Sequence, residues 1–369
     1  MKYGIVELYC GNSGKKGYYN NQEVGLARAM ADKGYQVTIF YPRTDISVEQ
    51  EEVIDSNIMI VYVPAKAIGV HGRYRWDVLE RYSIDVVQLG SDNQIFAPSL
   101  AKYCSKHSIR LYHYIGTVGS DSANKCKRLV MNLLIKRNVQ MLRKHKCFAK
   151  TEYVKKQLEK KKVKNVEIVP VGLDTEIIPE IPYEKRELRE KLGLPQDTKI
   201  VLFVGRIDEY KKPFQALDLL AELQEDNEKN YYLVIIGSGE LNQELNERIE
   251  AGGLADRICR IERLPNEKVH EYYVACDYFV NFNPNEIFGM SIMEAMYHGC
   301  TVLAKHAPGP DCIIENGKSG YLVNSPEEMK QLILRDTTLA KDAVKLRIQA
   351  VFTWKNAAQK FHEWIVTGK

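Results

Sequence analysis

The sequence predicts an α/β protein with two Rossmann-like, doubly wound domains. Segments typical of buried strands alternate with amphipathic helical segments over residues 2–115, and the alternation begins again at residue 199. Between the two sets, residues 170–182 are punctuated by proline and glycine, as is typical of a hinge. A chain of 369 residues is too long for one ordinary core but suits two domains with a crevice between them. Such alternation forms parallel sheets covered by helices.

The first domain is predicted to begin with a βαβ unit whose loop contains Gly11, Gly14 and Gly17. This spacing is not the dinucleotide fingerprint, and no acidic residue ends the second strand, where Tyr41 is followed by proline and arginine. The pattern therefore argues against a dehydrogenase. The predicted strands are residues 2–9, 35–41, 58–63, 84–89 and 110–115, with helices at about residues 20–33 and 92–106.

The strand at residues 110–115 places His113 near the carboxyl edge of the first sheet, where doubly wound domains bind ligands. A histidine at such a position is either a hydrogen-bonded structural residue or a catalytic group. Its position alone leaves both interpretations open.

Residues 125–164 are strongly basic, with 15 Lys and Arg residues against only Glu152 and Glu159. The interleaved apolar residues spread over more than one helical face, which favours a partly buried helix with solvated lysines. Attraction to anionic lipid or to an acidic acceptor is the alternative. Nucleic acid is not expected as a partner, because aromatic platforms and recognised modules are missing.

Charge is divided unevenly along the chain. Residues 1–174 contain 28 Lys and Arg against 17 Asp and Glu, and the remainder contains 24 against 31. The first part is therefore net positive and the second net negative, which predicts different partners for the two halves.

The second domain is predicted to repeat the first. Its strands are expected at residues 199–204, 231–236, 258–261, 278–282 and 301–304. Its helices are expected at about 213–225, from the turn at 237–239 to about 251, at about 266–275, and after Gly289. An amphipathic helix near residues 354–365 stands where it would bridge the domains. The predicted organisation is an N-terminal domain at 1–173, a C-terminal domain at 174–350 and a bridging C-terminal helix at 351–369.

The stretch Asn285–Met296 combines a carboxylate in a loop, a glycine that opens a helix and a second carboxylate on that helix. The backbone N–H groups and positive dipole at a helix start suit a phosphate. With Glu286 before this point and Glu294 after it, one ligand could have its anionic middle held by amides and its hydroxyls held at either end. A nucleotide sugar has this shape.

The same residues resemble a known family. One motif is Glu-x-Phe-Gly-x-x-x-x-Glu, formed by Glu286, Phe288, Gly289 and Glu294. A second motif precedes it and consists of Gly205-Arg206, with Lys212 six residues after the arginine. This pattern resembles the retaining glycosyltransferases of family 4, which have the GT-B fold of two Rossmann-like domains facing across a cleft, with a C-terminal helix returning toward the N-domain. The resemblance extends over nearly the whole chain and is strongest from residue 199 to 323.

The resemblance implies a role for each matching residue of the second domain. Glu286 is expected to hold donor-sugar hydroxyls, Glu294 the ribose, and Arg206 with Lys212 the departing diphosphate, while the main chain near Leu264 meets the base. The backbone amides of Gly289, Met290 and Ser291, at the helix start, are expected to bind the diphosphate. Phe288, which precedes them, is also expected in the donor site.

In the first domain, the resemblance implies that His113 lies near sugar and acceptor, which makes His113, Arg206, Lys212 and Glu286 the expected catalytic residues. Gly14 and Gly17 are expected near the donor. Many relatives have adjacent glycines in that loop, whereas this chain separates them and inserts Lys15-Lys16.

No Asp-x-Asp occurs, so no metal or other cofactor is expected, with cations standing in for a metal clamp. The eight cysteines are scattered without a CxxC pair, which argues against a zinc site and against disulfides.

The first residues read as a strand rather than a signal peptide, and no apolar run approaches the roughly 18 residues of a membrane span. A cytoplasmic enzyme is therefore expected, with peripheral attachment to the inner face of the membrane left open.

The expected function is retaining transfer of a sugar from a nucleoside diphosphate sugar to a glycan, lipid-linked or other hydroxyl acceptor, in the synthesis of cell-surface polysaccharide or glycoconjugate. A GT-B nucleotide-sugar epimerase or hydrolase, and a two-domain sugar-binding module, are the alternatives.

Overall fold

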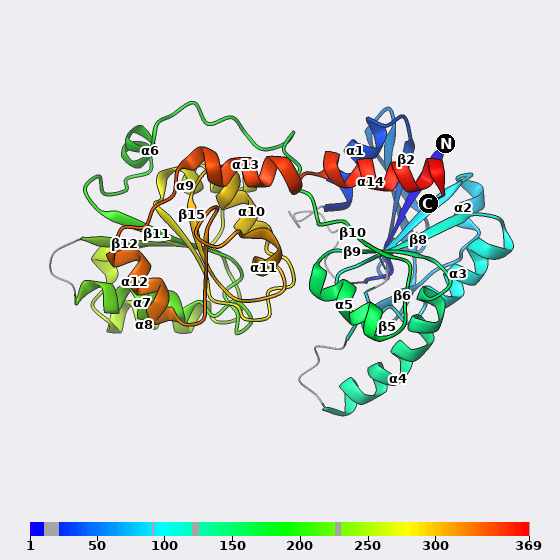
Figure 1. The fold of residues 1–369 in the computed structure, drawn as a ribbon, viewed down its shortest axis with the longest axis horizontal. Coiled ribbons are helices and arrows are strands. Elements are labelled where there is room, and N and C mark those ends of the chain that lie inside the picture. The colour runs from blue at the N-terminus through cyan, green and yellow to red at the C-terminus, as the bar shows by residue number, and fades with distance from the viewer. Residues whose placement is uncertain (11–21, 91, 120–124, 226–229, 369) are drawn as a thin grey trace. The chain divides into compact units, whose positions relative to one another are not determined.

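The computed structural model describes residues 1–10, 22–90, 92–119, 125–225 and 230–368. The chain forms two compact units, one comprising Met1–Asp174 with Thr353–Lys369 and the other Thr175–Phe352 (Figure 1). Each unit contains its own parallel sheet and its own apolar core. The predicted fold class of two Rossmann-like domains is confirmed.

The first unit is built on an eight-stranded sheet with the order β10-β9-β8-β7-β1-β2-β4-β3. Only β3, which lies at an edge, runs antiparallel to its neighbour. The strands are β1 (Lys2–Val6), β2 (Gln36–Arg43), β3 (Gln50–Asp55), β4 (Ile58–Pro64), β7 (Val86–Gly90), β8 (Arg110–Ile115), β9 (Lys146–Ala149) and β10 (Val166–Ile168). A separate hairpin joins β5 (Lys66–Ile68) to β6 (His71–Arg73). Its helices are α1 (Gln22–Ala31), α2 (Val78–Arg81), α3 (Ala97–Lys106), α4 (Lys125–Leu142), α5 (Glu152–Lys160) and α14 (Trp354–Thr367).

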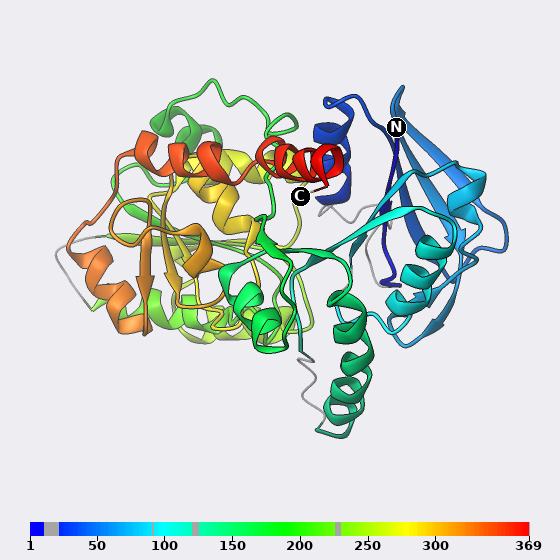
Figure 2. The same ribbon diagram turned by 45° about the vertical axis from the view of Figure 1, so that its right-hand side comes forward.

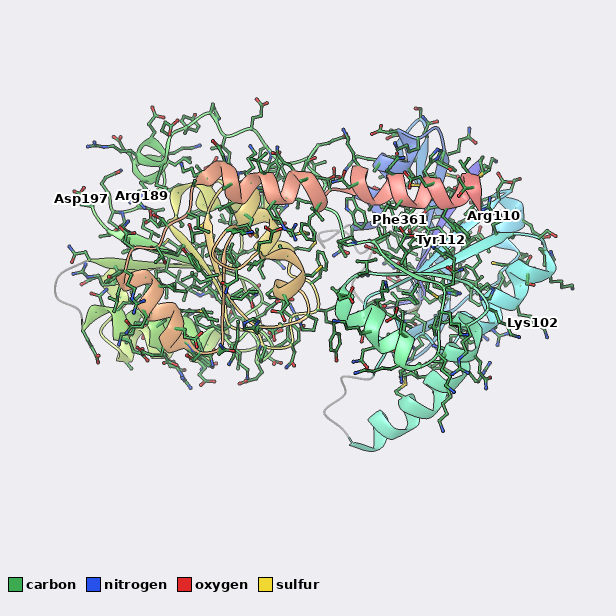
Figure 3. The ribbon with its side chains drawn as sticks, viewed as in Figure 1. Lys102, Arg110, Tyr112, Arg189, Asp197 and Phe361 are labelled. Atoms are coloured by element: carbon green, nitrogen blue, oxygen red, sulfur yellow. The ribbon has the colours of Figure 1, made fainter. Side chains whose placement is uncertain are left out.

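Helix α14 returns to the first unit and packs on it through aromatic side chains. Phe361 stacks on Tyr112 of β8 with ring centroids 5.1 Å apart (Figure 3). Arg110 lies over the Trp364 ring. Two glycines permit the close approach of Trp354, because a Cβ at Gly25 or Gly172 would lie less than 3 Å from it. The last helix therefore packs on the first unit through buried side chains, among them Trp354 and Phe361.

The second unit contains a six-stranded, fully parallel sheet with the order β13-β12-β11-β14-β15-β16. Its strands are β11 (Lys199–Val204), β12 (Tyr231–Ile236), β13 (Ile258–Ile261), β14 (Tyr278–Asn281), β15 (Thr301–Lys305) and β16 (Tyr321–Val323). Its helices are α6 (Lys185–Lys191), α7 (Phe214–Gln224), α8 (Asn242–Ala251), α9 (Asn266–Ala275), α10 (Met290–Tyr297), α11 (Pro310–Ile313), α12 (Pro326–Leu334) and α13 (Lys341–Val351), with a 3-10 turn at Ala255–Arg257.

Buried Arg189 attaches α6 to the second sheet (Figure 3). Its guanidinium donates to Asp277 at 2.7 Å and to the carbonyls of Ala275 and Thr198. Two of these contacts tie α6 to the start of β14, which leads toward Glu286, and the third ties it to the start of β11.

Each sheet has one point at which the strand order reverses. In the first sheet β1 lies between β2 and β7, and in the second β11 lies between β12 and β14. Ligands of doubly wound domains bind beyond the carboxyl ends of the strands at such a point. Both units therefore present a candidate binding edge.

Candidate active site

The loops at the switch point of the second sheet are held against each other by glycines. A Cβ at Gly237 would lie 1.7 Å from the carbonyl oxygen of Gly205, and one at Gly239 would lie 2.3 Å from that of Ile207. The Ile207 N–H donates to the Ser238 carbonyl at 3.1 Å. The segment that follows β11, which contains Arg206, is therefore closely supported by the turn after β12.

Glu286 is buried and its carboxylate is fixed on several sides. Lys211 Nζ donates to Glu286 Oε2 at 2.5 Å, and the side-chain amides of Asn281 and Asn283 donate to it at 3.2 and 3.4 Å. The Asn283 side chain also accepts from the N–H of Asn285, which shapes the loop. The oxygen that receives these three donors is therefore held in one place.

Lys211 is a site residue that sequence reasoning missed. It stands directly before Lys212, and no spacing in the sequence distinguishes the two lysines. The structure separates them, because Lys212 has a left-handed φ of +57° and its Nζ pairs with Glu209 at 3.1 Å.

Arg206 and Lys212 form local ion pairs near the chain surface. Arg206 pairs with Asp208 at 2.9 Å, and the side chains of Arg206 and Lys212 are 65% and 42% exposed. The Lys212–Glu209 pair is exposed on both sides, and pairs of this kind contribute at most about 1 kcal/mol. Exchange of Glu209 for a ligand phosphate would therefore cost the fold little. Asp208 is only 14% exposed, and the N–H of Lys211 also donates to it.

Helix α10 begins at a glycine in a left-handed conformation. Gly289 has φ +102°, and no side chain caps the helix start. The first N–H groups of a helix, here those of Met290 and Ser291, have no intrahelical acceptor and lie at the positive end of the dipole. The structure thus has an anion-binding helix start directly after Glu286.

The loop before α10 is backed by Gly309. Its N–H donates to the Glu286 carbonyl at 2.9 Å, and a Cβ there would lie 2.1 Å from the carbonyl oxygen of Phe288. The buried Phe288 ring packs near Phe352 on its other side. The position of the helix start is therefore fixed by packing.

Glu294 lies on α10 and accepts a hydrogen bond from the Tyr273 hydroxyl at 2.9 Å. Burial raises the pKa of Glu294, whereas the Tyr273 hydrogen bond acts in the opposite direction. Leu264 is half-buried in the loop between β13 and α9. The structure thus brings Arg206, Lys212, Glu286, Glu294 and the α10 start into one unit, together with Leu264.

His113 lies in β8 of the first unit, and its side chain is fully buried. Its ring centroid is 5.2 Å from that of His145. Burial, with a smaller effect from His145, lowers the pKa of His113 to about 3, so the imidazole is neutral at physiological pH. Its catalytic role stays a prediction, and direct contact with substrate requires the side chain to become accessible. Gly14 and Gly17 lie outside the described residues.

The arrangement in the second unit suits an anionic group with hydroxyl-bearing groups on both sides. Amides and two cations are available for the anion, and one carboxylate is available on either side of the helix start. Within the described ranges, no group of three His, Cys, Asp or Glu side chains is placed to hold a metal ion.

Two family models match the chain. "Glycosyl transferases group 1" matches residues 184–350 and "Glycosyltransferase Family 4" matches residues 24–177. The D-inositol 3-phosphate glycosyltransferase of Corynebacterium diphtheriae is 28% identical over 209 residues, which are 53% of this chain and 49% of that protein. The 2-deoxystreptamine glucosyltransferase of Streptomyces kanamyceticus is 28% identical over 168 residues, 45% and 43% of the two chains. The chain spans about half the length of these curated relatives or less.

Solved structures resemble the chain over its full length. Sucrose-phosphate synthase from Thermosynechococcus elongatus has a TM-score of 0.77 at 17% identity, covering 99% of this chain and 98% of that one. Anabaena HepE in complex with UDP and glucose has a TM-score of 0.71 at 16% identity, covering 100% of both chains. These likenesses confirm the GT-B fold.

Proposed function

Because the chain belongs to family 4 of the glycosyltransferases, we propose that it transfers a sugar from a nucleoside diphosphate sugar to an acceptor hydroxyl with retention of configuration. The observation that carries this proposal is the geometry around α10. A fixed buried carboxylate, an uncapped helix start and a second carboxylate follow one another within nine residues, Glu286 to Glu294.

Each group has a role in the proposed transfer. Glu286 accepts from hydroxyls of the donor sugar, and Glu294 accepts from the ribose hydroxyls. The diphosphate lies at the start of α10, and the base lies near the main chain of Leu264. Since Lys211 holds Glu286, we add Lys211 to the groups that position the donor sugar.

Departure of the diphosphate places negative charge on its oxygens. The amides at the α10 start stabilise this charge without reorganisation, which is the most effective form of electrostatic catalysis. Arg206 and Lys212 add to this stabilisation when they exchange their carboxylate partners for the phosphate oxygens. In the proposed front-face attack, the leaving phosphate accepts the proton of the acceptor hydroxyl. The reaction then needs neither a protein base nor a metal or other cofactor.

The donor is identified by thermal unfolding in the presence of UDP, GDP, ADP and dTDP sugars, because a ligand that binds the folded state stabilises it by mass action. Sugars of one of these four nucleotides are expected to raise the unfolding temperature, and Glu294→Ala should abolish that rise. Glu247→Gln, which alters an exposed acid on α8 of the same unit, serves as the control. No stabilisation by any series would refute the proposal.

The alternative of a nucleotide-sugar epimerase or hydrolase uses the same donor site without an acceptor. Incubation of the stabilising nucleotide sugar with the protein alone distinguishes the two. A transferase leaves most of the donor intact until an acceptor is added, whereas rapid consumption or isomerisation without acceptor would favour the alternative. A sugar-binding module would release no nucleotide in either case.

We further propose a glycan or lipid-linked acceptor in cell-surface polysaccharide or glycoconjugate synthesis, with the enzyme cytoplasmic and peripheral on an anionic membrane. Support comes from α4, which extends from the sheet of its unit (Figures 1 and 2). In its second half, Ile135 and Val139 are buried while Lys136 and Arg137 are exposed, so cations rather than apolar side chains are presented to the surroundings.

No helix among the described residues is long and apolar enough to cross a membrane. Membrane attachment is tested by co-sedimentation with anionic liposomes at low and high salt. Binding that weakens as salt rises is expected for electrostatic attachment. Lys136→Glu with Arg137→Glu should abolish it, and unchanged binding in this variant would refute a role for α4.

A further inference from the structure

Helices α9 and α10 of the second unit pack against each other and are joined by side-chain hydrogen bonds at two places. The Tyr273 hydroxyl of α9 donates to Glu294 Oε2 of α10 at 2.9 Å. Nδ1 of His270 and Nε2 of His298, the residue that ends α10, share a hydrogen bond of 2.8 Å. Residues three or four positions apart lie on one face of a helix, so the two bonds hold one face of α9 against one face of α10.

Tyr273 is itself firmly held. Its side chain is fully buried, and its ring is stacked on that of His298 with an interplanar angle of 10°. On another side it lies near Phe279 of β14, with ring centroids 6.0 Å apart. Burial lowers the pKa of His270 to about 4 and that of His298 to about 3, so both imidazoles are neutral at physiological pH. The histidine pair therefore supports Tyr273 by packing and adds no charge beside Glu294.

The carboxylate of Glu294 is fixed at one oxygen and available at the other. Its side chain is partly exposed, and no donor from the described ranges reaches Oε1. Ordering the rotatable bonds of a glutamate costs entropy, which a ligand would otherwise have to offset. The Tyr273 hydrogen bond orders them before a ligand arrives. It also stabilises the ionised carboxylate, because it opposes the effect of burial on the pKa of Glu294.

A carboxylate ordered in this way discriminates between ligands with and without a pair of neighbouring hydroxyls. Each carboxylate oxygen has two lone pairs, so Glu294 can accept from Tyr273 and from both hydroxyls of a ribose at the same time. A nucleotide without these hydroxyls leaves the carboxylate without donors on its ligand side, and sites of this kind reject such analogues. A mobile carboxylate would discriminate less, because it could turn toward water instead.

We propose that Tyr273 is a positioning residue, which acts through Glu294 to make the donor site selective for a ribose over a deoxyribose. This inference rests on the proposed transferase function and on the role given there to Glu294. Because Tyr273 is fully buried, it acts without touching the ligand. Its hydroxyl determines where the carboxylate lies, and the carboxylate determines which nucleotides bind tightly.

The test compares nucleoside diphosphates that differ only in their ribose hydroxyls. Dissociation constants of UDP, GDP and ADP, and of their 2′,3′-dideoxy forms, are measured on the full chain by isothermal titration calorimetry. The wild type should bind the tightest of the three at least about tenfold more tightly than its dideoxy form, as a hydrogen bond to a charged group implies. Tyr273→Phe should lower this ratio about fivefold, the effect of one net hydrogen bond, by weakening the ribonucleotide alone.

Three comparisons distinguish positioning from a general structural role. Tyr272→Phe makes the same change at the neighbouring buried position of α9 and should leave the ratio as in the wild type. In a Glu294→Ala background, Tyr273→Phe should have no further effect on the ratio, since a residue that acts through another adds nothing once that other is removed. Steady-state kinetics of Tyr273→Phe should show a raised donor KM, with kcat within about twofold of the wild type.

An unchanged ratio in Tyr273→Phe, an equal loss of affinity for both forms, or tighter binding of dTDP than of all three ribonucleotides would overturn the inference. Both forms are titrated into the same sample, so any unfolded fraction cancels from the ratio. Failure of the wild type to bind any of these nucleotides would instead refute the proposed transferase function. The two failures are therefore distinguishable.

Discussion

Substitution of the adjacent residues Lys211 and Lys212 is predicted to have different effects. The Lys211 substitution should mainly lower the free energy of unfolding, and the Lys212 substitution should mainly lower kcat. Lys211→Met removes the cation from Glu286, whose side chain is 7% exposed in the pair. Removal of one partner of a buried ion pair costs about 3–5 kcal/mol, because the remaining charge is left uncompensated. Since the amides of Asn281 and Asn283 still donate to Glu286, we expect the lower end, about 3 kcal/mol.

Lys212→Met should have the opposite profile. Its partner Glu209 is 70% exposed, so the pair contributes at most about 1 kcal/mol to stability. Loss of a cation from the departing diphosphate, by contrast, should cost about 2–4 kcal/mol of transition-state stabilisation. Arg206→Ala is expected to lose kcat by a similar amount.

Thermal unfolding and steady-state kinetics measure the two effects. Lys211→Met should lower the unfolding temperature of the second unit by about 6–12 °C, from about 2–4 °C per kcal/mol for a domain of this size. Adding Glu286→Gln should recover much of that loss, since no buried charge then remains. Lys212→Met should unfold near the wild-type temperature and lose kcat. A stable Lys211→Met protein, or a Lys212→Met enzyme with normal kcat, would refute the corresponding assignment.

Three further predictions follow from the geometry. Glu294→Ala should raise the donor KM and Glu286→Ala should mainly lower kcat; wild-type kinetics in both would contradict these roles. Gly309→Ala should weaken donor binding, measured by thermal shift, because its Cβ would displace the Phe288 carbonyl. Glu7 has a pKa raised from 4.5 to about 8 in the folded protein, so between these values the folded state binds a proton that the unfolded state does not. The free energy of unfolding should therefore fall as pH rises from 4.5 to about 8. Glu7→Gln should flatten that dependence in unfolding titrations, and an unchanged slope would show that another group is responsible.

The sequence predicts those elements whose buried side chains follow a clear period. β11, β12 and β14 are nearly all buried, and their predicted bounds match closely. β3 was missed because nearly all of its residues are exposed, as suits a charged strand at a sheet edge. The hairpin β5–β6 was missed for a related reason, since β5 is wholly exposed. Periodicity cannot reveal a strand that contributes little to the core.

Residue types and spacing predict a donor site, but the contacts among its residues depend on backbone conformation. Gly289 was predicted to open a helix, and it does. The sequence does not predict which lysine pairs with Glu286. The two neighbouring side chains have different partners, and the left-handed φ of Lys212 contributes to this difference. His113 was placed on the correct strand, whereas its complete burial depends on packing that strand alternation does not specify.

The charge of a domain and the charge of its ligand are set by different residues. Residues 1–174 are net positive, yet the switch point of their sheet gathers Glu7, Glu23 and Asp92 around one lysine. The remaining residues are net negative, yet their switch point presents Arg206, Lys212 and a helix start to an anion. Net charge therefore describes what attracts each surface over long range, as the exposed cations of α4 illustrate. We expect the charge of a ligand to follow instead from the few groups that the strand order brings to the sheet edge, as the second unit illustrates.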